Sequence, residues 1–388
     1  MSPYVLLCVS GALAIFSSTM AKSPVLPLYA SYLGVGPLGI GIIASVSPIA
    51  GITCSALAGV FADRYGSKRM LTVASVIFFT APLLYLLAVN VTLLSLLRFY
   101  HGLATAIMIP VSMALISSTY AEKKGEALGM FSSATLAGRF VAPIAGGAVV
   151  GYLASTPRLG FNAVYLICSV SGLITLVLIS QLPKDNISKV KATRTDVVKA
   201  LKGLTTHRGI LLTGGVEAAV LFSYGTFETF LPVYLINKGM NPYEIGAVLS
   251  AQIISVALTK PIMGRLSDKY GRPSQITVGI LLCAIFICLI IYANGIIVAM
   301  VLSIAFGLSI SVVTSATSAL IGDMSLKGQL SSSMGVFASI MDIGHTTGPL
   351  VSGIIAAYFG IGKVFIVSSV VLLIMFSTFI TYRSRLAL

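Results

Sequence analysis

Long apolar stretches separated by short polar ones fill almost the entire chain. An α-helix needs about 20 mainly apolar residues to cross the hydrocarbon core of a bilayer. Charged residues and Gly, Pro or Asn divide the chain into twelve stretches of this kind, at roughly 4–32, 38–62, 70–90, 92–119, 126–154, 161–182, 209–236, 243–266, 275–293, 296–321, 329–358 and 363–382. The pattern predicts an all-α integral membrane protein with twelve transmembrane helices.

One longer polar segment, Pro183–Arg208, interrupts this pattern in the middle of the chain. It carries seven basic residues against two acidic ones. Its second half, residues 195–204, has the pattern of a short amphipathic helix that lies on a membrane surface. We interpret residues 183–208 as a cytoplasmic linker between an N-terminal six-helix half, 1–182, and a C-terminal six-helix half, 209–388.

The two halves share a sequence repeat. Residues 59–69 read Gly-Val-Phe-Ala-Asp-Arg-Tyr-Gly-Ser-Lys-Arg, and residues 264–272, 205 positions later, read Gly-Arg-Leu-Ser-Asp-Lys-Tyr-Gly-Arg. The same offset pairs Gly34 with Gly239. Matches at a nearly fixed period indicate two copies of one structural unit. We therefore expect two pseudo-symmetric six-helix bundles.

Composition excludes a soluble protein and sets the expected topology. The 388 residues are 57% hydrophobic and 9% charged, whereas soluble proteins carry about 25% charged residues. Of the 25 basic residues, 18 lie on the side of the linker, and three, Arg158, Lys238 and Lys363, on the opposite side. Because cytoplasmic loops are enriched in Lys and Arg, the linker and both termini are predicted to be cytoplasmic. The net charge of +14 then reflects topology, and no basic run interleaved with aromatic residues suggests nucleic-acid binding.

The five cysteines indicate neither a disulfide framework nor a metal site. All of them lie in apolar stretches, and their spacing matches no pattern of metal ligands. We expect no metal and no cofactor. The N-terminal apolar stretch has no basic region before it, so we interpret it as the first span and not as a cleaved signal peptide.

Twelve spans in two halves, a central cytoplasmic linker and a Gly-x-x-x-Asp loop motif in both halves together resemble the major facilitator superfamily. The resemblance implies a secondary transporter that works by alternating access, with its substrate bound near the middle of the membrane. It also implies that the two loops close a cytoplasmic gate, with Gly59 allowing close helix approach and Gly66 turning the chain. The residues assigned to gating are Gly59, Asp63, Arg64, Gly66, Arg69, Gly264, Asp268, Gly271 and Arg272. The alternative is a tight charged turn that only fixes the topology.

Two further stretches are similar to motifs of the twelve-span drug:proton antiporter group. Residues 137–147, Ala-Gly-Arg-Phe-Val-Ala-Pro-Ile-Ala-Gly-Gly, resemble its Gly-x-x-x-Gly-Pro-x-x-Gly-Gly motif, with Ala142 in place of the glycine before Pro143. Residues 97–102, Leu-Arg-Phe-Tyr-His-Gly, resemble its arginine motif, which is linked to proton transfer. The resemblance implies export of a small molecule in exchange for protons, and it adds Pro143 to the gating residues. No ATP-binding loop is present, so a primary pump is not expected.

Ionisable residues inside the predicted spans are the best indication of functional positions, because a charge in hydrocarbon is costly unless it faces water or another charge. The basic ones are Lys22, Arg98, Arg139 and Lys260, the acidic ones are Glu217, Glu228 and Asp342, and the histidines are His101 and His345. For proton coupling we predict Glu228, Asp342 and Glu217, in this order, together with Arg98 and His101. The alternatives are static ion pairs, hydrogen-bonded core histidines, and a Lys260 side chain that extends to the cytoplasmic interface.

For substrate binding we predict Lys22, Tyr29, Arg139, Tyr224, Glu228 and His345. Ser18, Lys22 and Tyr29 have the spacing of one helix face, as have Glu217, Tyr224 and Glu228. The repeat offset maps Lys22 onto Phe227, which is next to Glu228 in the sequence. Such matching positions approach each other across a two-fold axis, which predicts an ion pair of Lys22 with Glu228 between the two halves. For any single aromatic residue of this set, packing is the alternative role.

Lys22 also bears on the kind of substrate. Some drug:proton antiporters carry an acidic residue in the first span as an anchor for cationic drugs, and this chain has Lys22 there. Four basic groups against three acids in the spans favour an anionic or polar organic substrate. We therefore expect a monomeric, multi-pass transporter of the cell membrane whose partners are a small-molecule substrate, protons and lipid. Proton-coupled uptake of an organic anion and uniport remain alternatives, and an enzyme is not expected because no nucleophile–base or metal constellation is present.

Overall fold

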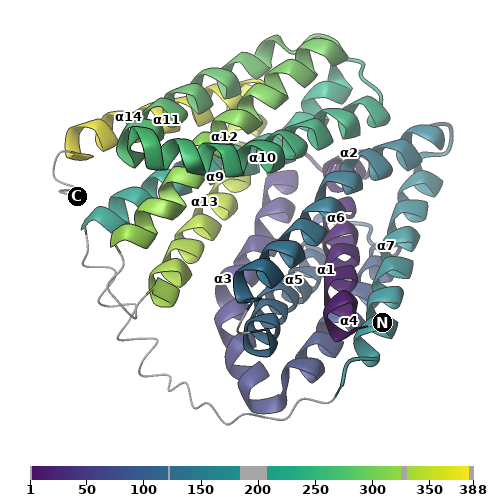
Figure 1. The fold of residues 1–388 in the computed structure, drawn as a ribbon. Helices are drawn as coiled ribbons and strands as arrows, with labels where there is room; N and C mark the ends of the chain where they lie inside the picture. Colours follow the sequence, from purple (N-terminus) through teal and green to yellow (C-terminus); the bar gives the residue numbers. More distant parts are fainter. Residues whose placement is uncertain (1, 121–122, 184–207, 325–329, 384–388) are drawn as a thin grey trace. The chain divides into compact units, whose positions relative to one another are not determined.

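Residues 2–120, 123–183, 208–324 and 330–383 are described by a computed structural model, and within these ranges the regular elements are all helices (Figure 1). They are α1 (Pro3–Met20), α2 (Val25–Tyr32), α3 (Pro37–Tyr65), α4 (Ser67–Tyr85), α5 (Val91–Thr119), α6 (Lys124–Tyr152), α7 (Pro157–Ser180), α9 (Arg208–Asn237), α10 (Pro242–Tyr270), α11 (Arg272–Leu289), the 3₁₀ turn η2 (Ile290–Tyr292), α12 (Ile296–Met324), α13 (Leu330–Phe359) and α14 (Lys363–Arg383). The predicted linker, apart from its two ends, lies outside the described residues.

The helices follow the predicted spans closely. In the described part of the chain, eleven helical stretches are long and apolar enough to cross a membrane, and α1 and α2 together form the first of them. The remaining long helix, α13, is more polar because Asp342, His345, Thr346 and Thr347 lie near its middle. The predicted all-α fold with multiple membrane spans is confirmed.

The first span differs from its prediction in one respect. Its helix stops at Met20 and starts again at Val25, with turns between. Pro24 has no N–H with which to continue the helix ladder. Lys22 therefore sits in a break and not on a continuous helix face. The expectation that Ser18, Lys22 and Tyr29 share one face of a single helix is wrong.

The helices group into two compact units. Unit 1 contains α1 to α7 together with Gly239–Ser250, which comprise the turn before α10 and the start of this helix. Unit 2 contains α9, the remainder of α10 and α11 to α14. The division expected from the sequence assigned all of α10 to the C-terminal half, so the start of this helix differs from that expectation.

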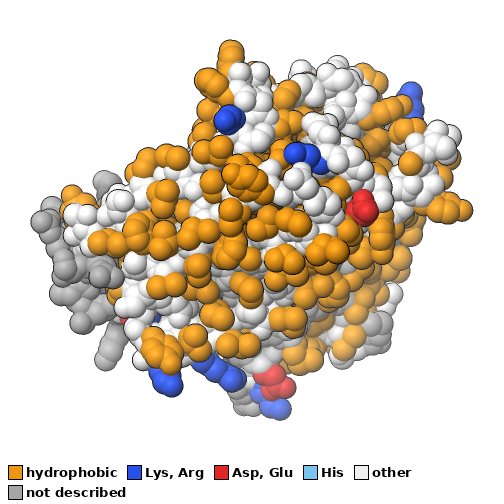
Figure 2. All heavy atoms as spheres, turned by 90° about the horizontal axis from the view of Figure 1, so that it is seen from above, with side chains coloured by type: hydrophobic (Ala, Val, Ile, Leu, Met, Phe, Trp, Pro, Cys, Tyr) orange, Lys and Arg blue, Asp and Glu red, His pale blue; other side chains and the backbone are white. Residues whose placement is uncertain are grey.

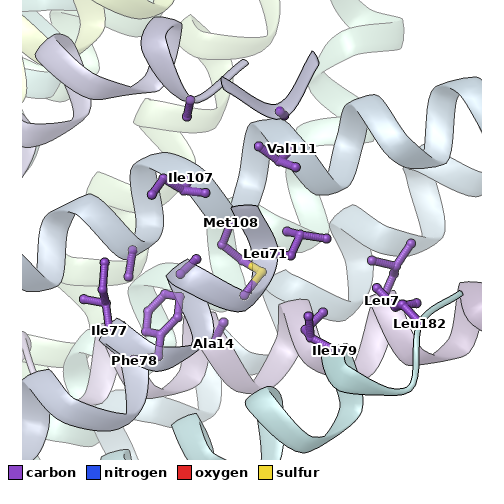
Figure 3. Close-up of a cluster of buried hydrophobic side chains, with 14 of the residues drawn as sticks. Leu7, Ala14, Leu71, Ile77, Phe78, Ile107, Met108, Val111, Ile179 and Leu182 are labelled. Carbon is purple, nitrogen blue, oxygen red and sulfur yellow. The ribbon is translucent and has the colours of Figure 1, made fainter. Parts of the chain in front are cut away.

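In unit 1 a hydrophobic core fills the space between α1, α4, α5 and α7. Phe78, Met108 and Ile179 are completely buried there, and their side chains converge (Figure 3). A Cβ atom added to Gly172 of α7 would stand 2.3 Å from the carbonyl oxygen of Phe78 on α4. Lipid tails are as apolar as these side chains, so membrane helices associate chiefly through such close packing of small residues.

Many hydrophobic side chains are exposed on the outer surface. Hydrophobic side chains are spread across the face in Figure 2, and the few charged side chains visible there lie in its upper part and along its lower edge. Exposed examples include Leu87, Leu258 and Ile297, whose exposed fractions are 66%, 69% and 76%. A surface of this kind would cause aggregation in water, whereas it suits contact with lipid.

The sequence repeat reappears in the backbone. Gly66 has φ 93° and ψ 142°, and its partner Gly271 has φ 86° and ψ 131°. Gly34 and Gly239, which the same offset relates, also have positive φ values of 76° and 85°. Side chains with a Cβ atom rarely adopt these conformations. The expectation that Gly66 turns the chain is confirmed by its geometry, and its repeat partner makes the same turn.

Candidate substrate and proton site

Glycines bring α9 and α13 of unit 2 into backbone contact. A Cβ atom added to Gly344 would stand 2.2 Å from the carbonyl oxygen of Ala218, and Gly348 is equally close to another carbonyl oxygen of α9. On α9, a Cβ atom at Gly225 would come within 3.0 Å of Cδ2 of His345. Small residues let two membrane helices approach in this way. Side chains that border this contact on α9 and α13 therefore lie directly beside each other.

Glu228 and His345 meet at this contact. Oε2 of the Glu228 carboxyl group lies 3.4 Å from Nε2 of His345, and Glu228 is only 8% exposed. The ring of Tyr224, one turn before Glu228, lies 5.8 Å from the imidazole ring. A buried carboxyl group beside an imidazole is suited to proton exchange, because imidazole gains and loses its proton near neutral pH.

Asp342 extends this group by one helical turn. It is half-buried on α13, three residues before His345, so both side chains lie on the same side of the helix. We refer to Tyr224, Glu228, Asp342 and His345 as the α9–α13 cluster. It brings together two of the three acids predicted for proton coupling and three of the residues predicted for substrate binding.

Glu217 occupies a separate position on α9. It lies eleven residues before Glu228, which corresponds to about 16 Å along the helix. Its carboxyl group is fully buried, and its Oε2 accepts a hydrogen bond of 2.6 Å from the hydroxyl group of Thr317 on α12. Its Oε1 has no hydrogen-bond partner in the part of the chain that is described. Lys260, exposed on α10, is close enough to act on this carboxyl group electrostatically.

Arg98 and His101, the other two residues predicted for proton coupling, lie in unit 1. Both are on α5 and almost fully buried, with exposed fractions of 2% and 1%. Rings of Phe78 and Tyr85 lie 5.6 and 6.0 Å from the imidazole of His101. Among the described side chains no carboxylate forms an ion pair with Arg98. The role of these two residues in proton transfer stays a prediction.

Three predicted substrate contacts also belong to unit 1. Lys22 is half-buried at the break between α1 and α2, and Arg139 is exposed on α6. Tyr29 donates a hydrogen bond of 3.0 Å to the carbonyl oxygen of Ala88 and packs against Phe161. These contacts favour the packing role for Tyr29. The predicted ion pair of Lys22 with Glu228 joins the two units and stays a prediction.

The first loop motif is anchored by a residue that was not assigned to gating. Lys68 donates hydrogen bonds to the carbonyl oxygens of Ser180, at 2.7 Å, and Leu182 at the end of α7. Arg64 is exposed and lies over the ring of Tyr65, and Arg69 is also exposed. The surroundings of Gly59 and the side chain of Asp63 lie outside the described part of the structure.

The second loop motif forms a small charge network. Arg272 contacts Asp268 through Nη2 at 3.3 Å and Asp323 through Nε at 2.8 Å, so it links the ends of α10 and α12. Gly264, the partner of Gly59 in the repeat, has no atom within 4 Å of the place where a Cβ would stand. Close helix approach, the reason expected for the first glycine of the motif, therefore does not apply at Gly264.

Pro143 lies where α6 packs against the start of α10, both in unit 1. Its carbonyl oxygen would be 2.3 Å from a Cβ atom on Gly246. One residue later, the N–H of Ile144 donates a hydrogen bond of 3.1 Å to the hydroxyl group of Ser250. This hydroxyl group in turn donates a hydrogen bond of 2.7 Å to the carbonyl oxygen of Phe140. The Ser250 hydroxyl group thus stands between a donor and an acceptor that are one helical turn apart in α6.

Sequence reasoning missed several of these partners. Thr317, Asp323 and Ser250 were not among the predicted site residues, although each contacts one of them or its immediate neighbours. The repeat offset pairs Ser250 with Ser45, and this match was a signal for Ser250. For Thr317 the only signal was a hydroxyl group within a very apolar span. Within the described residues no three His, Cys, Asp or Glu side chains are placed to hold a metal ion.

Comparison with known proteins establishes the family. The family model described as the Major Facilitator Superfamily matches residues 7–243 and again residues 216–386. The chain is a Major Facilitator Superfamily transporter. The resemblance inferred from the duplicated loop motif is thereby confirmed. As a member of this family, the chain is a transporter of small molecules across a membrane and not an enzyme.

The relatives of this transporter include efflux proteins. It is 22% identical over 335 residues to Multidrug resistance protein 2 of Bacillus subtilis, covering 86% of this chain and 83% of the relative. It is 25% identical over 355 residues to the multi-drug resistance efflux pump PmrA of Streptococcus pneumoniae, covering 89% and 87%. The crystal structure of the nucleoside transporter NupG (D323A mutant) superposes with a TM-score of 0.83 at 16% identity, covering 98% of this chain and 99% of that chain. This last likeness concerns the fold alone.

Proposed function

We propose that this transporter exports a small organic molecule in exchange for protons. The observation that carries the proposal is the pair of the buried Glu228 and the half-buried His345 in a chain whose relatives include multidrug efflux pumps. An acid exchanges a proton during transport if its surroundings change between two conformations. For Glu228 the proposal requires a shift between α9 and α13 during transport, which would separate the carboxyl group from His345 on the other helix.

In the proposed cycle the proton and the substrate alternate at the α9–α13 cluster. An ionised Glu228 is held by His345 and, in this proposal, by Lys22. A proton that arrives on Glu228 removes its charge and weakens this hold, which allows the protein to reorient. Release of the proton on the other side restores the charged carboxylate before the next substrate is carried. Asp342, one turn away from His345, is the second carboxyl group that we assign to this exchange, and Glu217 is the third.

We infer that the substrate is anionic or polar. The spans carry Lys22, Arg98, Arg139 and Lys260 against three acids, and Lys22 replaces the acid that anchors cationic drugs in some antiporters. Tyr224 offers an aromatic surface beside His345 for an apolar part of the substrate. The names of the relatives refer to many drugs, and they support export rather than any one compound.

The remaining proposals concern topology and gating. The excess of Lys and Arg on one side favours cytoplasmic termini and a cytoplasmic linker, in a cell-membrane protein that works as a monomer. The loop around Asp268 and Arg272 is proposed to close the cytoplasmic side, and the ion pair of Arg272 with Asp323 supports this role because it ties α10, α11 and α12 together. Pro143 is proposed to take part in the same motion through its contact with the start of α10.

The direction of the proton gradient tests the proposal. Purified protein is reconstituted into liposomes, and labelled substrates from a panel of cationic drugs, neutral sugars and organic anions are added outside. Export in exchange for protons predicts faster entry of a substrate when the interior is acidic, because protons leave as the substrate enters. A pH-sensitive dye inside the vesicles reports the matching rise in internal pH.

The same assay separates the alternatives. Faster entry with an acidic exterior would indicate symport, as expected for uptake of an organic anion. A rate of substrate entry that is the same with either direction of the proton gradient would indicate uniport. Either result would contradict proton-coupled export. Liposomes without protein give the passive rate for each compound.

A further inference from the structure

A second group of buried polar side chains lies in unit 1, apart from the α9–α13 cluster. Arg98 and His101 of α5, Tyr85 at the end of α4 and Tyr165 of α7 are each at most 2% exposed. The rings of Tyr85 and Tyr165 are stacked 4.8 Å apart, and that of His101 lies 6.0 Å from Tyr85. Arg98 lies three residues before His101, so the two side chains are on the same side of α5. We refer to these four residues as the Arg98 cluster.

Several polar atoms of the Arg98 cluster have no hydrogen-bond partner within the described part of the chain. This holds for Nε of Arg98, both ring nitrogens of His101 and the hydroxyl groups of Tyr85 and Tyr165. A neighbouring tyrosine shows the contrast, since the Tyr29 hydroxyl group donates to the carbonyl oxygen of Ala88. Buried polar atoms without partners are rare in proteins, and several in one place usually mark an unseen partner such as water or an ion.

The charge of the cluster is also unbalanced. A guanidinium group keeps its proton under all ordinary conditions, and burying it without a counter-ion is costly. The described carboxylates of unit 1 are accounted for elsewhere: Glu126 is exposed in the first turn of α6, and Glu244 accepts a hydrogen bond from the N–H of Asn241. Asp63 lies at the end of α3, far along the helix from the level of Arg98. Ala50, thirteen residues before Asp63 on α3, packs beside Gly102, which is one helical turn from Arg98 on α5.

The donors of the cluster match one kind of ligand. Arg98 offers N–H groups, the two tyrosines offer O–H groups, and His101 offers an N–H group. Water would satisfy these hydrogen bonds but would leave the positive charge uncompensated. We propose that the Arg98 cluster binds a small monovalent anion, with chloride as the ion of suitable charge and size in cells. The nearly complete burial of all four side chains disfavours a bulky ligand at this place.

Such a site goes beyond proton-coupled export and does not depend on it. An anion bound to Arg98 compensates the charge of the guanidinium group within the first bundle, and it holds α4, α5 and α7 together through groups from each helix. The carboxylate group of a transported substrate is also an anion that accepts hydrogen bonds, so it is a second source of such a ligand. The experiment therefore compares inorganic and organic anions.

Thermal unfolding of the purified full-length protein tests the proposal. Unfolding is followed with a thiol-reactive dye, which reports exposure of the buried thiols of Cys168 and Cys283. Sodium chloride replaces sodium gluconate at constant ionic strength over about 1 to 100 mM, because a ligand that binds only the folded state stabilises it by mass action. We expect a saturable rise of the melting temperature by about 2 °C or more, with bromide and nitrate acting like chloride.

Variants connect the effect to the cluster. Arg98→Gln removes the charge and should abolish the response to chloride, whereas Arg158→Gln, an exposed arginine at the start of α7, should keep it. Tyr165→Phe keeps the charge and removes one donor, so it should raise the half-saturating chloride concentration by about fivefold, the equivalent of one hydrogen bond. This second variant keeps the test valid if Arg98→Gln does not fold.

Three outcomes decide the proposal. A chloride response that is lost in Arg98→Gln and weakened in Tyr165→Phe supports an inorganic anion site. A response to organic carboxylates alone, with the same dependence on the two variants, supports the anion site and identifies the substrate as its source. Equal melting temperatures in all anions, or a chloride response that is unchanged in Tyr165→Phe, would overturn the proposal and leave water as the partner of these donors.

Discussion

Glu228 and His345 lie beside each other where α9 and α13 are in backbone contact, with 3.4 Å between Oε2 and Nε2. The pair depends on the glycines of this contact, because larger residues there would move the helices apart. Gly225 lies directly against the imidazole ring, and Gly344, one residue before His345, lies against α9. The position of a proton-exchanging group is thus set by backbone packing.

Gly344→Ala should therefore impair both stability and transport. Its new Cβ atom would stand 2.2 Å from the carbonyl oxygen of Ala218, so the helices must separate, at a cost of about 1–3 kcal/mol for such overpacking. The measurements are the melting temperature and the rate of transport in proteoliposomes. Gly215→Ala on α9 is the matched control, since its Cβ atom would meet only Met375 at an ordinary distance of 3.6 Å. Equal effects of the two variants would contradict the packing argument.

Ser250→Ala should destabilise unit 1. The substitution leaves the N–H of Ile144 and the carbonyl oxygen of Phe140 without the hydroxyl group that lies between them. Loss of a partner by a buried backbone group costs about 1–3 kcal/mol. Ser133→Ala on the same helix removes an exposed hydroxyl group that bonds only within its own turn, and its effect should stay within about 0.5 kcal/mol. A melting temperature of Ser250→Ala equal to that of Ser133→Ala would refute the bridging role.

The two glycines of the second loop motif should differ sharply in their tolerance of alanine. Gly271 has φ 86°, and an alanine in this conformation is strained by about 1–3 kcal/mol. Gly264 lies within α10 with no atom near the place of a Cβ, so Gly264→Ala should gain up to about 1 kcal/mol in helix propensity. Melting temperatures of the two variants give the comparison. A destabilised Gly264→Ala would reveal a close approach that the structure does not contain.

Lys22→Ala should change substrate preference. If Lys22 binds a negative charge of the substrate, its removal weakens anionic substrates by about tenfold, as for the loss of a charge-assisted hydrogen bond. Neutral substrates should be affected much less. Competition assays in proteoliposomes with both classes measure the difference, and Lys363→Ala, an exposed lysine at the start of α14, provides the control. Equal losses for anionic and neutral substrates would exclude this role.

Much of the fold could be predicted because membrane spans follow directly from sequence. The lipid core demands long apolar helices, and the charged loops mark their ends. The repeat also pointed to the turns at Gly66 and Gly271, since matching glycines at a fixed offset indicate matching backbone conformations. The break between Met20 and Val25 was missed because prolines such as Pro48 and Pro110 are accommodated inside other helices, so Pro24 by itself did not predict it.

The candidate site was harder to predict than the fold. Charges within spans singled out Glu228 and His345 separately, but spacing along one helix does not say which neighbour a side chain meets. The glycines at positions 225, 344 and 348 carried the missing information, because they permit α9 and α13 to touch. Tyr85 and Tyr165 could not be recognised at all, since an isolated tyrosine in an apolar stretch does not reveal whether its hydroxyl group finds a partner.

The most direct test of proton-coupled export is the behaviour of Glu228→Gln in proteoliposomes. Glutamine keeps the size and the hydrogen bonding of the side chain but cannot exchange a proton. Two quantities are measured in the same preparation: accumulation of substrate driven by a proton gradient, and exchange of labelled for unlabelled substrate without a gradient. Glu126→Gln, which changes an exposed carboxyl group in the first turn of α6, serves as the control and should leave both unchanged.

We expect Glu228→Gln to lose accumulation driven by the gradient and to retain exchange, because the protein can still reorient with substrate bound. Accumulation at the wild-type level in this variant would contradict the assignment of Glu228 as the coupling acid. Loss of exchange together with accumulation would instead place Glu228 in the binding of the substrate.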